Sequence, residues 1–164
     1  MAGKATAQDL IDAGFGPDQF GAVTDWLGTF LPGILLLSEL WARTALGEPA
    51  YDAAVPTAPT LPNKHAAALI RRAETYHAAA ELWRRRAAAV DRNAVAGLSD
   101  MAYLNRREYL AHAVEAESTA RDLLSRAGEV LGIVIDDASP GSALSVGHVE
   151  SGRFPTTSTT AVVA

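Results

Sequence analysis

The sequence predicts an all-α fold, a helical bundle built on one long antiparallel helix pair at about residues 63–94 and 100–131. In both segments, apolar and alanine positions recur at alternating steps of four and three residues, the period of helices that pack along a seam. Alanine, the strongest helix former, dominates the apolar residues, which make up 49% of the 164-residue chain. A chain of this length and apolar content is expected to bury its own core.

The segment 63–94 carries the clearest pattern. Asn63 is the expected N-cap, and the helix would be about 45 Å long at 1.5 Å per residue. Its seam positions are Leu69, Ala73, Tyr76, Ala80, Trp83, Ala87, Val90 and Ala94.

The segment 100–131 is the expected partner helix. Gly97-Leu98-Ser99 interrupts the first helix, and Ser99 is a suitable N-cap for the second. Its seam positions are Tyr109, Ala113, Ala116, Ala120, Leu123, Ala127 and Val130. Because the connection is short, the two helices must pack antiparallel, and the alanines allow their backbones to approach closely.

Short helices are expected before this pair. Thr6 with Asp9 forms a capping-box pattern, and Gly14 would end that first helix. Pro17 would open a second helix that runs to about Phe30.

A third helix would carry Pro32 in its first turn and run to Leu46, with Gly47 as its stop. Its broad apolar face consists of Ile34, Leu36, Leu37, Leu40 and Trp41. Residues 47–62 then hold four prolines, a density that favours an extended linker over the surface of the helices.

The chain is expected to divide into a bundle domain at 1–131 and a C-terminal arm at 132–164. Residues 131–135 are rich in β-branched side chains, 139–142 form a turn signal, and 143–149 could return as a strand. From Phe154 the sequence is typical of an extended arm. Such an arm could add a strand to the β-sheet of a partner, or it could be a terminus without a role. Candidate interface residues in the arm are Phe154, Pro155, Val162 and Val163.

Three aromatic residues of the N-terminal part, Trp26, Phe30 and Trp41, are either core or interface, and core is the simpler expectation. The apolar stretch around them has only 13 uncharged residues between Asp25 and Glu39, too few to span a bilayer. No membrane contact is therefore expected.

The sequence shows no catalytic pattern, so we expect neither an enzyme nor a cofactor. The absence of cysteine excludes disulfides, thiolate nucleophiles and cysteine-bound zinc. No glycine-rich phosphate loop and no Gly-x-Ser-x-Gly elbow is present.

Two groups of residues have spacings that are found in functional sites. Glu74-x-x-His77 has the spacing of carboxylate-bridged metal centres in helical bundles, but a second such pair is missing, so a surface ion or hydrogen-bonding pair is expected instead. Arg84-Arg85-Arg86 point in three directions about 100° apart, which favours ion-paired, solvated side chains over one phosphate-binding patch.

Charge is unevenly distributed. Residues 1–60 hold two basic and seven acidic residues, whereas 61–130 hold eleven basic and nine acidic residues. An acidic end and a mildly basic middle suit head-to-tail self-association.

Several stretches resemble the helical head-to-tail adaptor (connector) proteins of tailed bacteriophages. They are 66–74 (AAALIRRAE), 81–86 (ELWRRR), Gly97-Leu98 and 107–111 (REYLA), within about residues 63–130. The resemblance implies a structural protein of the virion neck, made in the host cytoplasm. It would form a ring under the portal protein, continue the DNA channel without sequence-specific binding, and dock tail, stopper or terminator proteins. Residues 154–164 would bind the portal protein.

Two alternatives stay open. Trp26-Leu27-Gly28 resembles the Trp-x-Gly tripeptide of helical-hairpin proteins exported by type VII secretion, although here it precedes the helix pair instead of lying in its turn. The other alternative is a metal-binding helical-bundle enzyme that uses Glu74 and His77.

Overall fold

The computed structural model describes residues 3–20, 30–94, 99–133 and 135. These residues are mostly helical and contain no β-strand, which confirms the all-α class for this part of the chain. The elements are α1 (Ala7–Asp12), the 3-10 helix η1 (Pro17–Phe20), α2 (Leu31–Leu46), α3 (Glu48–Ala53), α4 (Leu61–Ala94) and α5 (Ser99–Leu131).

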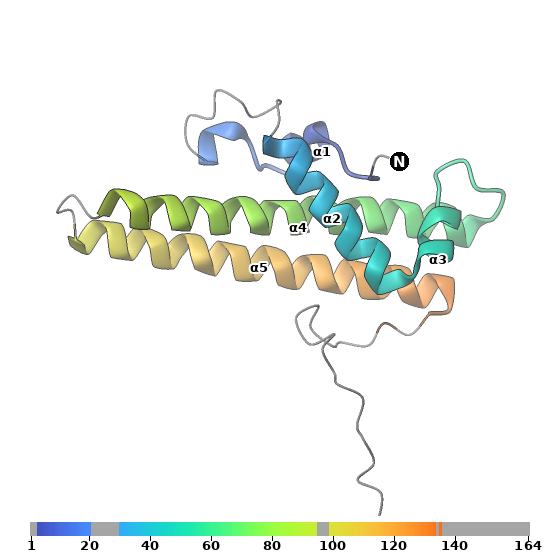
Figure 1. Cartoon of the computed structure of the whole chain (residues 1–164). Helices are drawn as coiled ribbons and strands as arrows, with labels where there is room; N and C mark the ends of the chain where they lie inside the picture. Colours follow the sequence, from blue (N-terminus) through green and yellow to red (C-terminus); the bar gives the residue numbers. More distant parts are fainter. Residues whose placement is uncertain (1–2, 21–29, 95–98, 134, 136–164) are drawn as a thin grey trace, which may run out of the picture.

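Helices α4 and α5 lie side by side along nearly their whole length and run in opposite directions (Figure 1). The side chains between them are small. Buried alanines on α4 include Ala73, Ala80 and Ala87, and those on α5 are Ala113, Ala116, Ala120 and Ala127. Larger side chains fill the layers between the alanines, and Trp83 stacks on Tyr109 with their ring centroids 5.5 Å apart.

Helix α4 also buries a second stripe, at steps of four residues: Ala66, Ile70, Glu74, Ala78 and Leu82. Helices α1 and α2 lie across this face of α4 (Figure 1). Since neighbours cover it on two sides, α4 is the central helix of the bundle, and it buries more of its surface than a single seam would.

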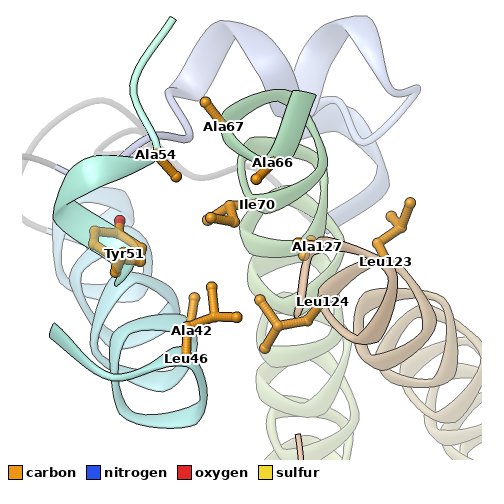
Figure 2. Close-up of a cluster of buried hydrophobic side chains, with 11 residues drawn as sticks. Ala42, Leu46, Tyr51, Ala54, Ala66, Ala67, Ile70, Leu123, Leu124 and Ala127 are labelled. Carbon is orange, nitrogen blue, oxygen red and sulfur yellow. The ribbon is translucent and has the colours of Figure 1, made fainter. Parts of the chain in front are cut away.

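Two buried clusters hold the N-terminal elements on this pair. One contains Leu10 of α1, Leu31 and Ile34 of α2, Ala78 and Leu82. The other joins the end of α2 and α3 to both long helices (Figure 2), through Ala42, Leu46, Tyr51, Ala54, Ala66, Ala67, Ile70, Ala73, Leu123, Leu124 and Ala127. Helix α2 is therefore fixed at both ends.

The expectation of an extended linker over 47–62 was wrong in its first part, because residues 48–53 form α3. Pro49 lies in the first turn of this helix, where a backbone N–H has no partner within the helix and its loss is harmless. The short helix α3 is stabilised by a tertiary contact, the burial of Tyr51, which is 2% exposed.

Two other helix boundaries differ from expectation. Helix α4 begins at Leu61, so Asn63 lies within its first turn and is not the N-cap. Pro62 is tolerated there for the same reason as Pro49. The stretch 17–20 forms a 3-10 helix, where an α-helix was expected. The rest of that expected helix, residues 21–29, lies outside the described residues.

Two glycines end helices in the left-handed conformation, Gly14 (φ 89°) and Gly132 (φ 73°). Both belong to the same capping motif. After Gly14, the N–H of Phe15 donates to the carbonyl of Leu10 at 2.8 Å, and after Gly132, that of Ile133 donates to Gly128 at 2.8 Å. The chain therefore turns sharply at both places, and Phe15 is brought back against the cluster around Leu10.

The expected hairpin and arm at 132–164 fall almost entirely outside the described residues. Ile135 is described, and it packs against the cluster at the end of α5. The candidate interface residues Phe154, Pro155, Val162 and Val163 lie outside the described residues, as does Trp26.

The capping box of α1 gives a first testable prediction. Thr6 Oγ1 accepts from the N–H of Asp9 at 3.3 Å, and Asp9 Oδ2 accepts from the N–H of Thr6 at 2.7 Å. Thr6→Ala should lower the free energy of unfolding by about 1 kcal/mol. Urea unfolding followed by circular dichroism measures this. Thr6→Ser keeps the hydroxyl and should be close to wild type; equal losses in both variants would contradict the role of the cap.

Candidate functional site

The outer face of α2 exposes a row of leucines. Leu36, Leu37 and Leu40 are 52%, 48% and 49% exposed, whereas Leu31 and Ile34 on the opposite face are buried. Gly33 and Thr44, both exposed, extend the row toward the two ends of the helix. We call Gly33, Leu36, Leu37, Leu40 and Thr44 the α2 stripe.

The α2 stripe has the character of a contact surface. Burying a leucine side chain fully is worth roughly 1.5–3 kcal/mol, so covering the three half-exposed leucines, which lie within about one turn and a half, would contribute several kcal/mol to association. The stripe contains no charged residue. A β-carbon added at Gly33 would meet no atom within 4 Å, so a partner helix has room to approach there. Contiguous apolar patches of this kind mark interaction sites.

The two described aromatic candidates flank the stripe. Trp41 is half-buried and stacks on His77 of α4, with ring centroids 4.4 Å apart and an interplanar angle of 13°. Phe30 is half-buried beside the cluster around Leu10, and the guanidinium of Arg85 lies 4.7 Å above its ring. Both side chains are thus partly buried in the bundle and partly exposed at its surface.

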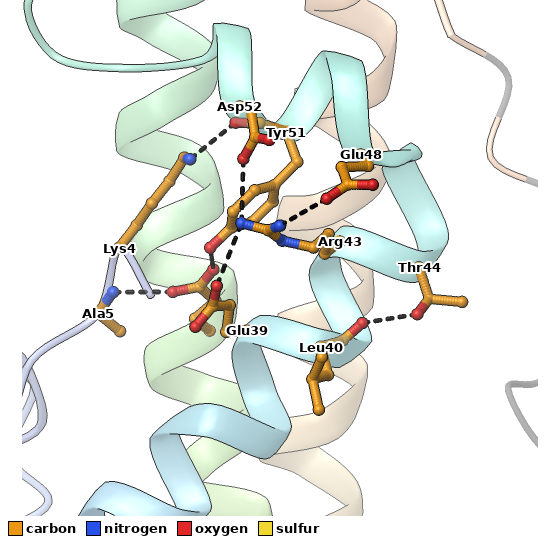
Figure 3. Close-up of polar contacts among 10 residues, drawn as sticks. Lys4, Ala5, Glu39, Leu40, Arg43, Thr44, Glu48, Tyr51 and Asp52 are labelled. Atoms are coloured by element: carbon orange, nitrogen blue, oxygen red, sulfur yellow. Dashed lines mark hydrogen bonds and ion pairs between the residues drawn. The ribbon is translucent and has the colours of Figure 1, made fainter. Parts of the chain in front are cut away.

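A buried polar cluster lies under α2 and fixes its position (Figure 3). The carboxylate of Glu74, which is fully buried, accepts hydrogen bonds from the Tyr51 hydroxyl and from the N–H of Ala5, the latter at 2.8 Å. Lys4 Nζ donates to the Tyr51 carbonyl at 2.8 Å and lies 3.7 Å above the Tyr51 ring. One carboxylate therefore ties together the N-terminal segment, α3 and α4.

Arg43 of α2 completes the cluster from the other side. It forms ion pairs with Glu39 at 3.3 Å, Glu48 at 3.1 Å and Asp52 at 3.0 Å. Its guanidinium also lies 5.0 Å from the centroid of the Tyr51 ring. These pairs join α2 to α3 and hold the sharp turn at Gly47, whose φ is 80°.

Burial governs the protonation of this cluster. Desolvation raises the pKa of Glu74, and the hydrogen bonds from Tyr51 and the backbone of Ala5 and Lys4 oppose that rise. Desolvation also lowers the pKa of Lys4, against the attraction of Glu74 and Asp52. The cluster is thus structural: its hydrogen bonds and ion pairs join the N-terminal segment to α3 and α4, and α2 to α3.

The expectation for Glu74 was wrong. Glu74 and His77 do not form a surface pair, because Glu74 lies inside the second buried stripe of α4. His77 contacts α2 instead, where its Nδ1 is 3.0 Å from Ser38 Oγ. Among the described residues, no three of His, Cys, Asp or Glu lie together as metal ligands.

His77 gives a pH prediction. Burial lowers its pKa below the ordinary 6.5, and the nearby Glu81 and Glu117 only partly oppose this. Between the lowered pKa and 6.5 the unfolded state binds more protons, so the free energy of unfolding should fall as the pH drops through this range. His77→Asn should remove that part of the slope. Urea unfolding of both proteins from pH 8 to 5 tests this; identical slopes would contradict it.

The three arginines have different neighbours, as expected, and the expected ion pairing is found at Arg84, whereas Arg85 and Arg86 lie over aromatic rings. Arg84 pairs with Glu81 and with Glu117 of α5. Arg85 covers Phe30, and Arg86 lies 4.7 Å from the ring centroid of Tyr109. They therefore do not form a phosphate-binding patch.

No family model, no curated protein and no solved structure matches this chain. Across the described ranges, no helix combines the length and apolar character needed to cross a membrane.

A second exposed apolar patch lies on α5, and sequence reasoning missed it. Leu104, Leu110 and Val114 are 57%, 38% and 67% exposed, and Ala111 between them is exposed as well. Leu104 lies nine residues before the buried Ala113, and nine residues at about 100° each rotate by two and a half turns. Leu104 therefore lies on the side of α5 opposite to the seam with α4. The sequence contained an indication of this patch, because residues 104–114 include more apolar residues than the seam positions in that stretch.

Proposed function

We propose that this chain is a structural subunit of a virion neck, a head-to-tail adaptor that assembles with copies of itself into a ring below the portal protein. The observation that carries the proposal is the α2 stripe. Helix α2 presents three half-exposed leucines on its outer face, and the ion pairs of Arg43 with Glu48 and Asp52 tie this helix to α3.

The architecture supports an assembly role in a second way. The paired helices α4 and α5 form a long, straight scaffold, and α2 packs across it (Figure 1). Such a scaffold keeps its interaction surfaces at fixed distances from one another. That property is useful in a ring, where small errors in the angle between neighbours would prevent closure.

The C-terminal arm supplies the second part of the proposal. Residues Phe154, Pro155, Val162 and Val163 would bind the portal protein, while other faces of the ring would receive tail, stopper or terminator proteins. The DNA would pass through the central channel without sequence-specific contacts. Deleting residues 154–164 should leave helicity intact and abolish portal binding in a pull-down assay; binding at the wild-type level would contradict the role of the arm.

Native mass spectrometry over a concentration series tests the ring. We expect a closed oligomer for the wild-type chain, alone or upon co-expression with a portal protein. Leu40→Asp places a charge in the α2 stripe and should reduce the oligomer to smaller species. Leu61→Asp is the matched control, because Leu61 is 80% exposed at the start of α4 and lies outside the stripe.

The outcomes separate the candidate functions. A ring that Leu40→Asp disperses and Leu61→Asp leaves intact supports the adaptor. A stable one-to-one complex with a different small helical protein would favour the secreted helical-hairpin alternative. A monomer in every condition, including co-expression with the portal, would contradict the proposal.

A further inference from the structure

We infer that the α2 stripe of one copy packs antiparallel against the exposed face of α5 in a second copy. This inference rests on the proposed function, because it names the neighbour that occupies the stripe in the ring. The face of α5 in question consists of Leu104, Arg107, Leu110, Ala111 and Val114, and we call it the α5 stripe.

The two stripes match in length and in chemistry. The α2 stripe extends over about 16 Å along its helix and the α5 stripe over about 15 Å, at 1.5 Å per residue. Each exposes three large apolar side chains. They lie on different faces of the molecule, since α2 packs on α4 and the α5 stripe points away from α4. One copy therefore cannot bring its own two stripes together.

Charge complementarity selects the partner. The α2 stripe ends beside Glu48 and Asp52, which pair with Arg43 but whose side chains are still 71% and 39% exposed and can meet a second cation. The α5 stripe contains the exposed cation Arg107. Two α2 stripes facing each other would have no exposed cation within the stripes to meet these carboxylates, whereas an α2 stripe facing an α5 stripe brings Glu48 toward Arg107.

Charge also selects the direction of packing. Antiparallel helices place Leu37 beside Val114, Leu40 beside Ala111 and the end of α2 beside Arg107 and Leu104. Parallel helices would instead bring Glu48 toward the exposed carboxylates Glu115 and Asp122. Like charges at a contact oppose association, so the antiparallel arrangement is favoured.

A contact between two different surfaces repeats from copy to copy. Each subunit offers one α2 stripe and one α5 stripe, so every added copy leaves one of each unoccupied. Such a series ends when the rotation between neighbours closes a ring, and otherwise continues as a filament. The same pairing therefore explains how one small chain builds a ring without a separate linker.

The absence of cysteine makes a cross-linking experiment clean. Leu37→Cys and Val114→Cys are prepared separately, mixed and oxidised with copper phenanthroline. The mixture should shift from the monomer band to a dimer band on a non-reducing gel. Each single variant alone should stay at the monomer band, because the contact joins two different surfaces. The double variant should give a ladder of higher oligomers or one closed species.

Ala68→Cys is the control for random collision, because Ala68 is exposed on α4 outside both stripes. Mixed with either variant, it should give no dimer. Arg107→Glu introduced into the Val114→Cys protein should lower the dimer yield, and Arg107→Lys should preserve it. All the substituted positions are exposed, and circular dichroism verifies that each variant is folded.

The results distinguish this pairing from the proposed function. A dimer from Leu37→Cys alone would show that α2 meets α2 and would overturn the inference. A ring in native mass spectrometry with no cross-link in the mixture would also overturn it while the adaptor function survives. A cross-linked mixture whose wild-type chain forms open filaments would support the pairing and contradict the ring.

Discussion

Replacing Glu74 by alanine is expected to lower the free energy of unfolding by about 3 kcal/mol or more, the largest effect of any single polar substitution in the described part of the chain. The reason is that two donors lose their acceptor at once. The Tyr51 hydroxyl and the N–H of Ala5 would remain buried without a partner, because α2 closes over them and water has little access.

Urea unfolding monitored by circular dichroism measures the loss. Glu115→Ala is the matched control, since Glu115 is exposed on α5 and its substitution should change stability by less than about 0.5 kcal/mol. Tyr51→Phe removes only one hydrogen bond and should cost less than Glu74→Ala. Combining the two should cost less than their sum, because both remove the same bond. A loss at Glu74 no larger than at Glu115 would show that the cluster does not stabilise the fold.

Replacing Ala80 by leucine should destabilise the protein by about 3 kcal/mol, at the upper end of the range for overpacked cores. Ala80 is fully buried and lies in one cluster with Ala116 of α5. Three additional carbon atoms have no space in that layer, so the long helices would have to separate. The separation would also open the neighbouring alanine layers, because both helices are straight and continuous.

The control for this prediction lies two turns further along the same helix. Ala88 is exposed, and Ala88→Leu should change the free energy of unfolding by less than about 0.5 kcal/mol, because the side chain extends into solvent. Chemical denaturation of both variants gives the comparison. Equal stabilities would mean that the α4–α5 layer tolerates leucine and that close approach is not what its alanines provide.

Local signals in the sequence predicted local structure well. The Thr6 capping box and the stop at Gly14 depend on residues within one or two turns, and both are present as expected. The class of fold followed from the alanine-rich, helix-period pattern. The helix in the linker did not follow, because α3 is a single short helix that depends on Tyr51 finding a buried place against α2 and α4.

The structural role of Glu74 could be predicted from the sequence only in part. It continues the four-residue spacing of Ala66, Ile70, Ala78 and Leu82, which indicates a buried position. A glutamate in such a stripe needs donors, and these come from Tyr51 and Ala5, distant by 23 and 69 residues. No sequence pattern links residues so far apart, so the cluster under α2 emerges only when the chain is folded.

The exposure of α2 depends on the tertiary structure for a similar reason. The sequence by itself determined that 31–46 is helical and that its apolar face is broad, because the spacing and the flanking Pro32 and Gly47 act within the helix. Which part of that face is buried depends on the width of the surface it meets. One narrow helix pair covers Leu31, Ile34 and Ala42 and leaves Leu36, Leu37 and Leu40 at the surface, where a partner can reach them.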